Sequence, residues 1–192
     1  MKSVLISIQP KWCELILKRK KTVEVRKTRP KLETPFKCYV YQTKGKEKLI
    51  DIIKDGDICY GETYHGKPVF IKMREDSVYA GLFGRKQKVI GEFVCDKIEY
   101  FNSAASEFAF SVAPSDIPCT LPMSEEKALE TCYQQGCLST NDVISYFGDE
   151  DWEAYFWHIS DLKIYDKPKK LGEFGLTRPP QSWCYVEEVK SL

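Results

Sequence analysis

The chain has 192 residues, of which 43% are hydrophobic, and its formal net charge at pH 7 is +1. This length fits a single domain that buries roughly 70% of its unfolded surface, so folding requires no disulfide or metal. No segment approaches the roughly 20 apolar residues of a membrane-spanning helix. The apolar run Val4–Ile8 is too short for a signal peptide and meets Gln9-Pro10 at once. We therefore expect a cytoplasmic protein without a membrane partner.

The first part of the chain predicts a strand, a helix and two further strands. Val4–Ile8 is a β-type run. Pro10 suits the first turn of a helix that extends to about Lys18. Thr22–Arg26 and Phe36–Gln42 both alternate in the manner of half-buried strands.

Residues 43–85 give the weakest signals, because glycines interrupt them repeatedly. Within them Leu49–Ile53 is compatible with a helix. Ile58–Tyr60 and Val69–Met73 are compatible with strands.

The rest of the chain predicts strands that flank a pair of helices. Ser124 and Ser139 are helix N-caps, and the two helices end at Gly136 and Gly148. The predicted strands are Val89–Tyr100 (bent at Gly91 or broken near Asp96), Ala154–Tyr165 and Ser182–Val189. Many short strands, one early helix and an inserted helical pair predict an α+β protein built on a small, mostly antiparallel β-barrel.

Eight cysteines raise the question of a metal site or disulfides. No pair has the C-x2-C spacing of a zinc site, and only His65 and His158 are available to complete one. Several cysteines alternate with aromatic residues, as in Cys38-Tyr39-Val40-Tyr41, where a thiol behaves as a small hydrophobe. We therefore expect free thiols, no metal and no cofactor.

Positive charge is concentrated near the N-terminus. Nine basic and two acidic residues lie between Lys11 and Lys31, which gives +7, and the other 20 basic and 26 acidic residues give −6. A local excess of this kind favours a polyanion or a phosphorylated ligand as partner. Along the second predicted strand, alternation places Thr22, Glu24 and Arg26 on one polar face.

The segment Lys20–Arg26 resembles the motif of the ASCH domain, which belongs to the PUA-like superfamily. The family pattern is roughly Gly-x-Lys-x-x-Glu-x-Arg. Lys21, Glu24 and Arg26 match this pattern, and Arg19 replaces the glycine.

Three later segments resemble longer ASCH proteins of bacteria and their prophages, namely Val89–Phe93, Trp157–Ser160 and Pro179–Trp183. The resemblance covers the first 42 residues well, and 85–101 and 152–189 more loosely. It implies a single PUA-like domain over residues 1–192, in which 43–84 and 102–150 embellish the barrel.

The resemblance implies a cleft, lined by the Lys–Glu–Arg strand, that binds RNA or a modified nucleoside or nucleotide. We expect phosphate contacts from Lys21 and Arg26, a base-edge contact from Glu24 and stacking on Trp157. The alternatives are a structural ion pair for Glu24 and a core position for Trp157. The full set of candidate ligand-binding residues is Lys20, Lys21, Thr22, Glu24, Arg26, Tyr41, Trp157, His158 and Ser160.

An enzyme is the alternative hypothesis. One ASCH branch resembles an amidohydrolase that acts on N4-acetylcytidine through a Lys, a Thr and a Glu. This chain keeps Lys21 but carries Glu24 where that branch has its Thr. Lys21 and Glu24 would then be the catalytic acid–base pair of an amidohydrolase or a metal-independent ribonuclease. Binding of an acidic protein partner is a third hypothesis.

Overall fold

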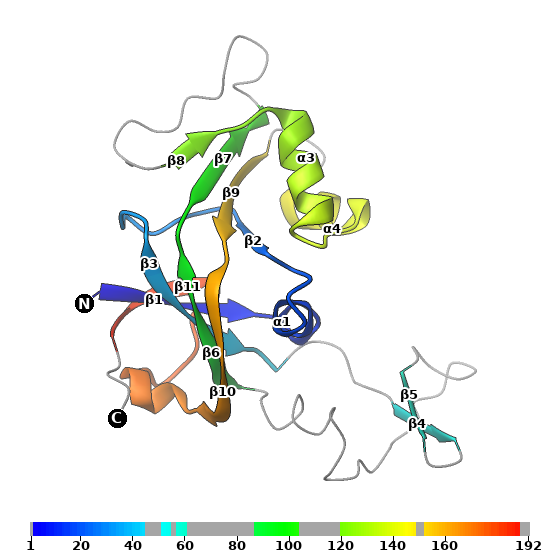
Figure 1. The fold of residues 1–192 in the computed structure, drawn as a ribbon, viewed down its shortest axis with the longest axis vertical. Coiled ribbons are helices and arrows are strands. Elements are labelled where there is room, and N and C mark those ends of the chain that lie inside the picture. Colours follow the sequence, from blue (N-terminus) through cyan, green and yellow to red (C-terminus); the bar gives the residue numbers. More distant parts are fainter. Residues whose placement is uncertain are drawn as a thin grey trace.

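The computed structural model describes residues 2–44, 51–54, 57–60, 87–103, 120–148 and 152–188. These residues form a mixed α+β fold with a five-stranded sheet, a four-stranded sheet and the two-stranded sheet β4–β5 (Figure 1). The elements are β1 (Lys2–Ile8), α1 (Pro10–Leu17), β2 (Val23–Arg26), β3 (Phe36–Gln42), β4 (Asp51–Lys54), β5 (Asp57–Tyr60), β6 (Lys88–Cys95), β7 (Ile98–Asn102), β8 (Thr120–Pro122), α3 (Glu125–Gln134), α4 (Thr140–Phe147), β9 (Glu153–His158), β10 (Ser160–Lys169), η2 (Leu171–Phe174) and β11 (Trp183–Glu187).

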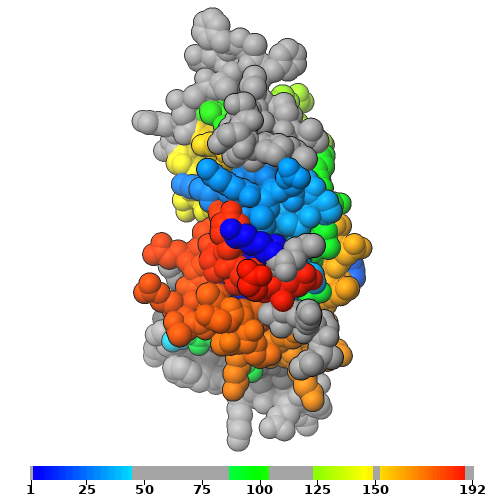
Figure 2. All heavy atoms as spheres, turned by 90° about the vertical axis from the view of Figure 1, so that its left-hand side faces the viewer, coloured from blue at the N-terminus to red at the C-terminus, as the bar shows by residue number. Residues whose placement is uncertain are grey.

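The five-stranded sheet has the order β10-β6-β3-β1-β11. Its pairs are antiparallel except β1–β3, which is parallel. Lys2 pairs with Glu187, so the first and last strands are neighbours. Figure 2 shows them side by side as the blue and red segments in the middle of one face. The C-terminal strand thereby brings the residues just before it close to the end of β1.

The four-stranded sheet has the order β2-β9-β7-β8. Ile159 alone separates β9 from β10, so the chain passes directly from this sheet into the five-stranded one. The expected α+β class and the mostly antiparallel pairing are confirmed. In the part of the chain that the structure describes, however, the strands form distinct sheets with unpaired outer strands and no closed barrel.

Three groups of buried side chains hold these layers together. The largest joins β1, α1 and β3 to β7 and β9, and therefore fills the space between the two sheets. The second lies under α3 and α4 on the other face of the four-stranded sheet and includes Val23 and Val25 of β2. The third packs η2 against the five-stranded sheet through Phe174. The valines of β2 therefore face the helical pair, and Glu24 and Arg26 face the opposite side.

The N-caps of the helical pair are confirmed. The Ser124 side chain accepts a hydrogen bond from the Lys127 amide at the start of α3. At the start of α4, Ser139 and Asp142 form a reciprocal capping box, which satisfies two amides that the first helical turn leaves free.

Two predicted long strands are each divided in two. Val89–Tyr100 becomes β6 and β7, and Ala154–Tyr165 becomes β9 and the first part of β10. At both breaks the chain changes sheet. The break near Asp96 is one of the two predicted alternatives, whereas the continuous apolar pattern does not reveal the break at Ile159. Residues 51–53 belong to strand β4 and not to the expected helix. Val69–Met73 lies outside the described residues.

From the sequence we expect no membrane-spanning helix, and we expect free thiols. Among the described residues, no helix combines the length and apolar character needed to cross a membrane. Six cysteines have free thiols, namely Cys13, Cys38, Cys95, Cys132, Cys137 and Cys184.

Candidate functional site

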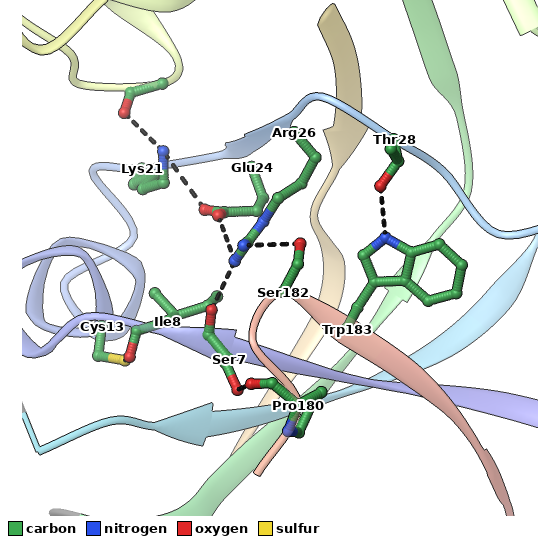
Figure 3. Close-up of polar contacts among 11 residues, drawn as sticks. Ser7, Ile8, Cys13, Lys21, Glu24, Arg26, Thr28, Pro180, Ser182 and Trp183 are labelled. Atoms are coloured by element: carbon green, nitrogen blue, oxygen red, sulfur yellow. Dashed lines mark hydrogen bonds and ion pairs between the residues drawn. The ribbon is translucent and has the colours of Figure 1, made fainter. Parts of the chain in front are cut away.

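The three matched motif residues meet on one side of β2. Arg26 Nη2 lies 2.9 Å from Glu24 Oε1, and Lys21 Nζ lies 3.5 Å from Glu24 Oε2. Their side chains are only 2% (Lys21), 7% (Glu24) and 10% (Arg26) exposed. Figure 3 shows Glu24 between the two cations. Of the polar face predicted from alternation, Glu24 and Arg26 are buried and Thr22 is exposed.

Arg26 connects β2 to the end of β1 and to the segment that precedes β11. Its Nη2 donates to the Ser7 carbonyl at 2.7 Å, and its Nη1 donates to Ser182 Oγ at 3.3 Å. Ser7 Oγ in turn donates to the Pro180 carbonyl at 2.7 Å (Figure 3). Both terminal nitrogens of the guanidinium are therefore engaged within the protein. Arg26 thereby holds Glu24 in place, and the phosphate contact expected of Arg26 stays a prediction.

Lys21 connects the same site to the helical pair. Its Nζ donates to the Gly136 carbonyl at 2.7 Å, just beyond the C-terminal end of α3. Helix C-termini carry partial negative charge, which favours a cation there. Lys21 Nζ also lies 5.2 Å from the centre of the Trp12 ring, within the range of a cation–π contact.

Glu24 Oε2 has an ion-pair contact with Lys21 but no hydrogen bond to the described protein. This oxygen is buried, and the buried Arg26 Nε also makes no hydrogen bond to the described protein. A buried acceptor without a hydrogen bond costs roughly 1–3 kcal/mol, and more when it is charged. The site also holds two buried cations for one buried anion, so it retains positive charge.

The three residues line a cleft of about 780 Å³. Small-molecule sites commonly enclose roughly 300–1,000 Å³. Basic side chains outnumber acidic ones, with Lys11, Lys21, Arg26 and Lys44 against Glu24 and Asp142. The other lining residues are Ser7, Ile8, Gln9, Trp12, Val25, Thr43, Leu138, Ser145, Tyr146, Gln181 and Ser182.

An ion pair joins two walls of this cleft. Lys11 Nζ of α1 lies 2.9 Å from Asp142 Oδ1 of α4. Burial alone would raise the pKa of Asp142, but hydrogen bonds from Ser139 and Lys11 outweigh it and lower that pKa from 3.8 to about 2. The carboxylate is therefore ionised at neutral pH and fixes the position of Lys11.

Several expected ligand-binding residues lie elsewhere. Lys20 and Thr22 are exposed but do not line the cleft. Trp157 is 0% exposed and packs against Phe36 and Trp183, so it offers no surface for base stacking and belongs to the core. Tyr41, at 2% exposure, is also a core residue.

His158 and Ser160 make structural contacts away from the cleft. His158 Nε2 lies 2.6 Å from Glu99 Oε2, and Lys97 Nζ lies 2.7 Å from Glu99 Oε1. Burial raises the pKa of Glu99, but the hydrogen bonds from Lys97 and His158 lower it overall. Ser160 Oγ donates to the Val94 carbonyl at 2.9 Å. Neither residue lines the cleft that Lys21, Glu24 and Arg26 share.

The cleft also contains residues that the sequence did not single out. Lys11 and Trp12 belong to the basic N-terminal segment, so their charge and position were visible signals. Ser182, Asp142 and Tyr146 are more than 100 residues from β2, and no local pattern connects them to it. Among the described residues, no group of three or more His, Cys, Asp or Glu side chains is placed to hold a metal ion.

The fold is similar to that of solved ASCH structures. The chain is similar to ASCH from Zymomonas mobilis, with 15% identity, a TM-score of 0.55 and coverage of 97% of this chain and 88% of that chain. A Tyr-to-Phe mutant of that protein has 16% identity and a TM-score of 0.55, with coverage of 98% of this chain and 92% of that chain. A Ser-to-Ala mutant has 16% identity and a TM-score of 0.53, with coverage of 97% of this chain and 89% of that chain. The sequence matches no protein-family model and no curated protein. The expected resemblance to ASCH domains is thus confirmed at the level of the fold.

Proposed function

We propose that this chain binds RNA, or a nucleotide with the same chemistry, in the cleft above Lys21, Glu24 and Arg26. The observation that carries the proposal is that Glu24 lines the cleft while its buried Oε2, 3.5 Å from Lys21 Nζ, makes no hydrogen bond to the described residues. A ligand N–H, such as the exocyclic amine of cytosine or the Watson–Crick edge of guanine, would supply the missing donor.

The charge of the cleft supports a ligand that also carries phosphate. Lys11 and Lys44 are exposed cations on its lining, and Lys21 adds a buried one. Because cations near a phosphate release counterions on binding, affinity should fall as salt increases. In this arrangement Lys11, Lys44 and Lys21 attract the backbone, and Glu24 reads a base edge. Arg26 acts as a positioning residue, since its terminal nitrogens hold Glu24 and the Ser7 carbonyl.

The direct test is the salt dependence of affinity for a short single-stranded RNA. We expect log Kd to rise linearly with log salt in the wild-type protein, and Lys44→Ala to reduce the magnitude of the slope by about 1. Lys31→Ala is the matched control, because Lys31 is exposed in the same basic region but does not line the cleft. Absence of RNA binding at low salt would overturn the proposal.

Hydrolysis is a second candidate, favoured by the 3.5 Å separation of Lys21 Nζ and Glu24 Oε2 on the cleft lining. An ammonium and a carboxylate at this distance can act as acid and base toward one bound ligand. Incubation with N4-acetylcytidine and with RNA, followed by product analysis, distinguishes binding from turnover. Product formed by the wild-type protein and lost in Glu24→Gln would establish the enzyme.

A further inference from the structure

Helix α4 has two faces with different roles. Val143 and Phe147, four residues apart, pack into the core under the helical pair. Asp142, Ser145 and Tyr146 follow the i, i+3, i+4 spacing of a shared helical face, and all three line the cleft. One wall of the cleft is therefore an ordered helix face that presents a carboxylate, a hydroxyl and an aromatic ring.

Among the described residues, Tyr133 and Tyr146 are the exposed aromatic side chains, and of these two Tyr146 lines the cleft. It is 40% exposed, whereas the described aromatic residues of the two main cores are largely enclosed. The Phe147 ring forms a T-shaped pair with the Tyr146 ring, with 4.7 Å between centroids and an interplanar angle of 78°. Lys27 Nζ lies 5.3 Å from the ring centre. The ring is thus held by its neighbours while remaining open to the solvent.

Trp12 also lines the cleft, but cations already lie over its ring. Lys11 Nζ is 4.1 Å and Lys21 Nζ is 5.2 Å from the Trp12 ring centre. A base would have to displace one of them to reach that ring. Lys27 Nζ lies over the Tyr146 ring, but Lys27, unlike Lys11 and Lys21, does not line the cleft.

We infer that one base of a single-stranded RNA stacks on the Tyr146 ring. The polar edge of that base, or a phosphate of the same RNA, then reaches Lys21 and Glu24 on the cleft lining. This inference rests on the proposed function and narrows its ligand to one that carries an unpaired base. Stacking on an aromatic ring tolerates any base, because every base has a π-face. Tyr146 thereby contributes affinity for unpaired bases, and Glu24 contributes any preference among them.

The test compares two probes, a short single-stranded RNA and an oligomer of abasic ribose phosphates of the same length. We expect Tyr146→Ala to weaken RNA binding roughly 5- to 150-fold, the range measured for loss of one base–aromatic stack. Affinity for the abasic oligomer should change less than about twofold, and Tyr146→Phe should retain RNA affinity because the ring remains. Tyr133→Ala is the matched control, since Tyr133 is 38% exposed on α3 and does not line the cleft.

The outcomes separate the two proposals. If Tyr146→Ala weakens both probes equally, or leaves RNA binding unchanged while the wild-type protein still binds RNA, the stacking inference is wrong and the proposed function stands. If the wild-type protein binds neither probe at low salt, the proposed function is wrong and the inference fails with it. Circular dichroism of each variant confirms that the exposed substitution leaves the fold unchanged.

Discussion

Arg26 and Glu24 form an ion pair on one face of β2, with 2.9 Å between Nη2 and Oε1 and side-chain exposures of 10% and 7%. Arg26 also donates to the Ser7 carbonyl and to Ser182, so one guanidinium joins β2, the end of β1 and the segment before β11. The pair therefore fixes a carboxylate at the cleft and links three parts of the chain that are distant in sequence.

Removal of Arg26 should destabilise the protein. Arg26→Ala leaves Glu24 buried beside a single cation at 3.5 Å, and breaking a buried ion pair in this way costs about 3–5 kcal/mol. Arg26→Lys should recover only part of this loss, because an ammonium lacks the planar fork that reaches several acceptors. Urea denaturation measures the free energy of unfolding of both variants. Lys31→Ala, at an exposed site, should change the free energy of unfolding by less than about 0.5 kcal/mol. Equal stability of Arg26→Ala and the wild-type protein would refute the role assigned to this residue.

Gly136→Ala should destabilise the protein because there is no room for a Cβ atom. A Cβ would lie 2.7 Å from the Cys132 carbonyl oxygen and 3.2 Å from Val25 Cγ2, and the first of these is a backbone atom that cannot move alone. Overpacking of this kind typically costs about 1–3 kcal/mol. The matched control is Gly172→Ala, where a Cβ would meet nothing within 4 Å. Thermal denaturation compares the two, and a similar loss in both variants would contradict the steric explanation.

The capping interactions of α4 should depend on pH. The pKa of Asp142 is about 2 in the folded protein and 3.8 in its ordinary state, so the ionised form stabilises the fold. This contribution is fully present above about pH 4 and is lost as the pH falls toward about 2. Asp142→Asn should lower the free energy of unfolding by about 1 kcal/mol at pH 7, the typical size of a helix-cap contribution. Denaturation curves of the wild-type protein and Asp142→Asn, measured at pH 7 and near pH 2, test this. The difference in their free energy of unfolding should disappear near pH 2. A difference of the same size at both pH values would show that the Asp142 carboxylate does not cause it.

The local elements were largely predictable from sequence, whereas the environment of the site was not. Alternation in β2 correctly separates Val23 and Val25 from Glu24 and Arg26, and the serine caps identify both helices of the pair. Charge counting predicted a basic region that favours a polyanion as partner, yet two of its cations, Lys21 and Arg26, are buried. Their partners, Gly136 and Ser182, are 115 and 156 residues away, and no periodic pattern encodes such contacts.

Trp157 illustrates the same limit. Alternation along its strand showed that Trp157 and His158 point to opposite faces but did not show which face meets the cleft. The pairing of β9 between β2 and β7 puts the Trp157 ring into the space between the sheets and leaves His158 beside Glu99. The order of strands in the sheet therefore decides that Trp157 is a core residue, and this order depends on contacts across the whole chain. The prediction of one domain with embellishments at 43–84 and 102–150 stays a prediction.

Measurement of RNA affinity with Glu24→Gln tests the central claim most directly. The amide keeps the shape of the side chain but removes the charge and replaces one acceptor oxygen with a donor nitrogen. We predict that a short single-stranded RNA binds wild-type protein at low salt and binds Glu24→Gln at least about 10-fold more weakly, about 1.4 kcal/mol, as expected for loss of a hydrogen bond to a charged group. Unchanged affinity in a folded Glu24→Gln protein would contradict the account, because the carboxylate would then not contact the ligand.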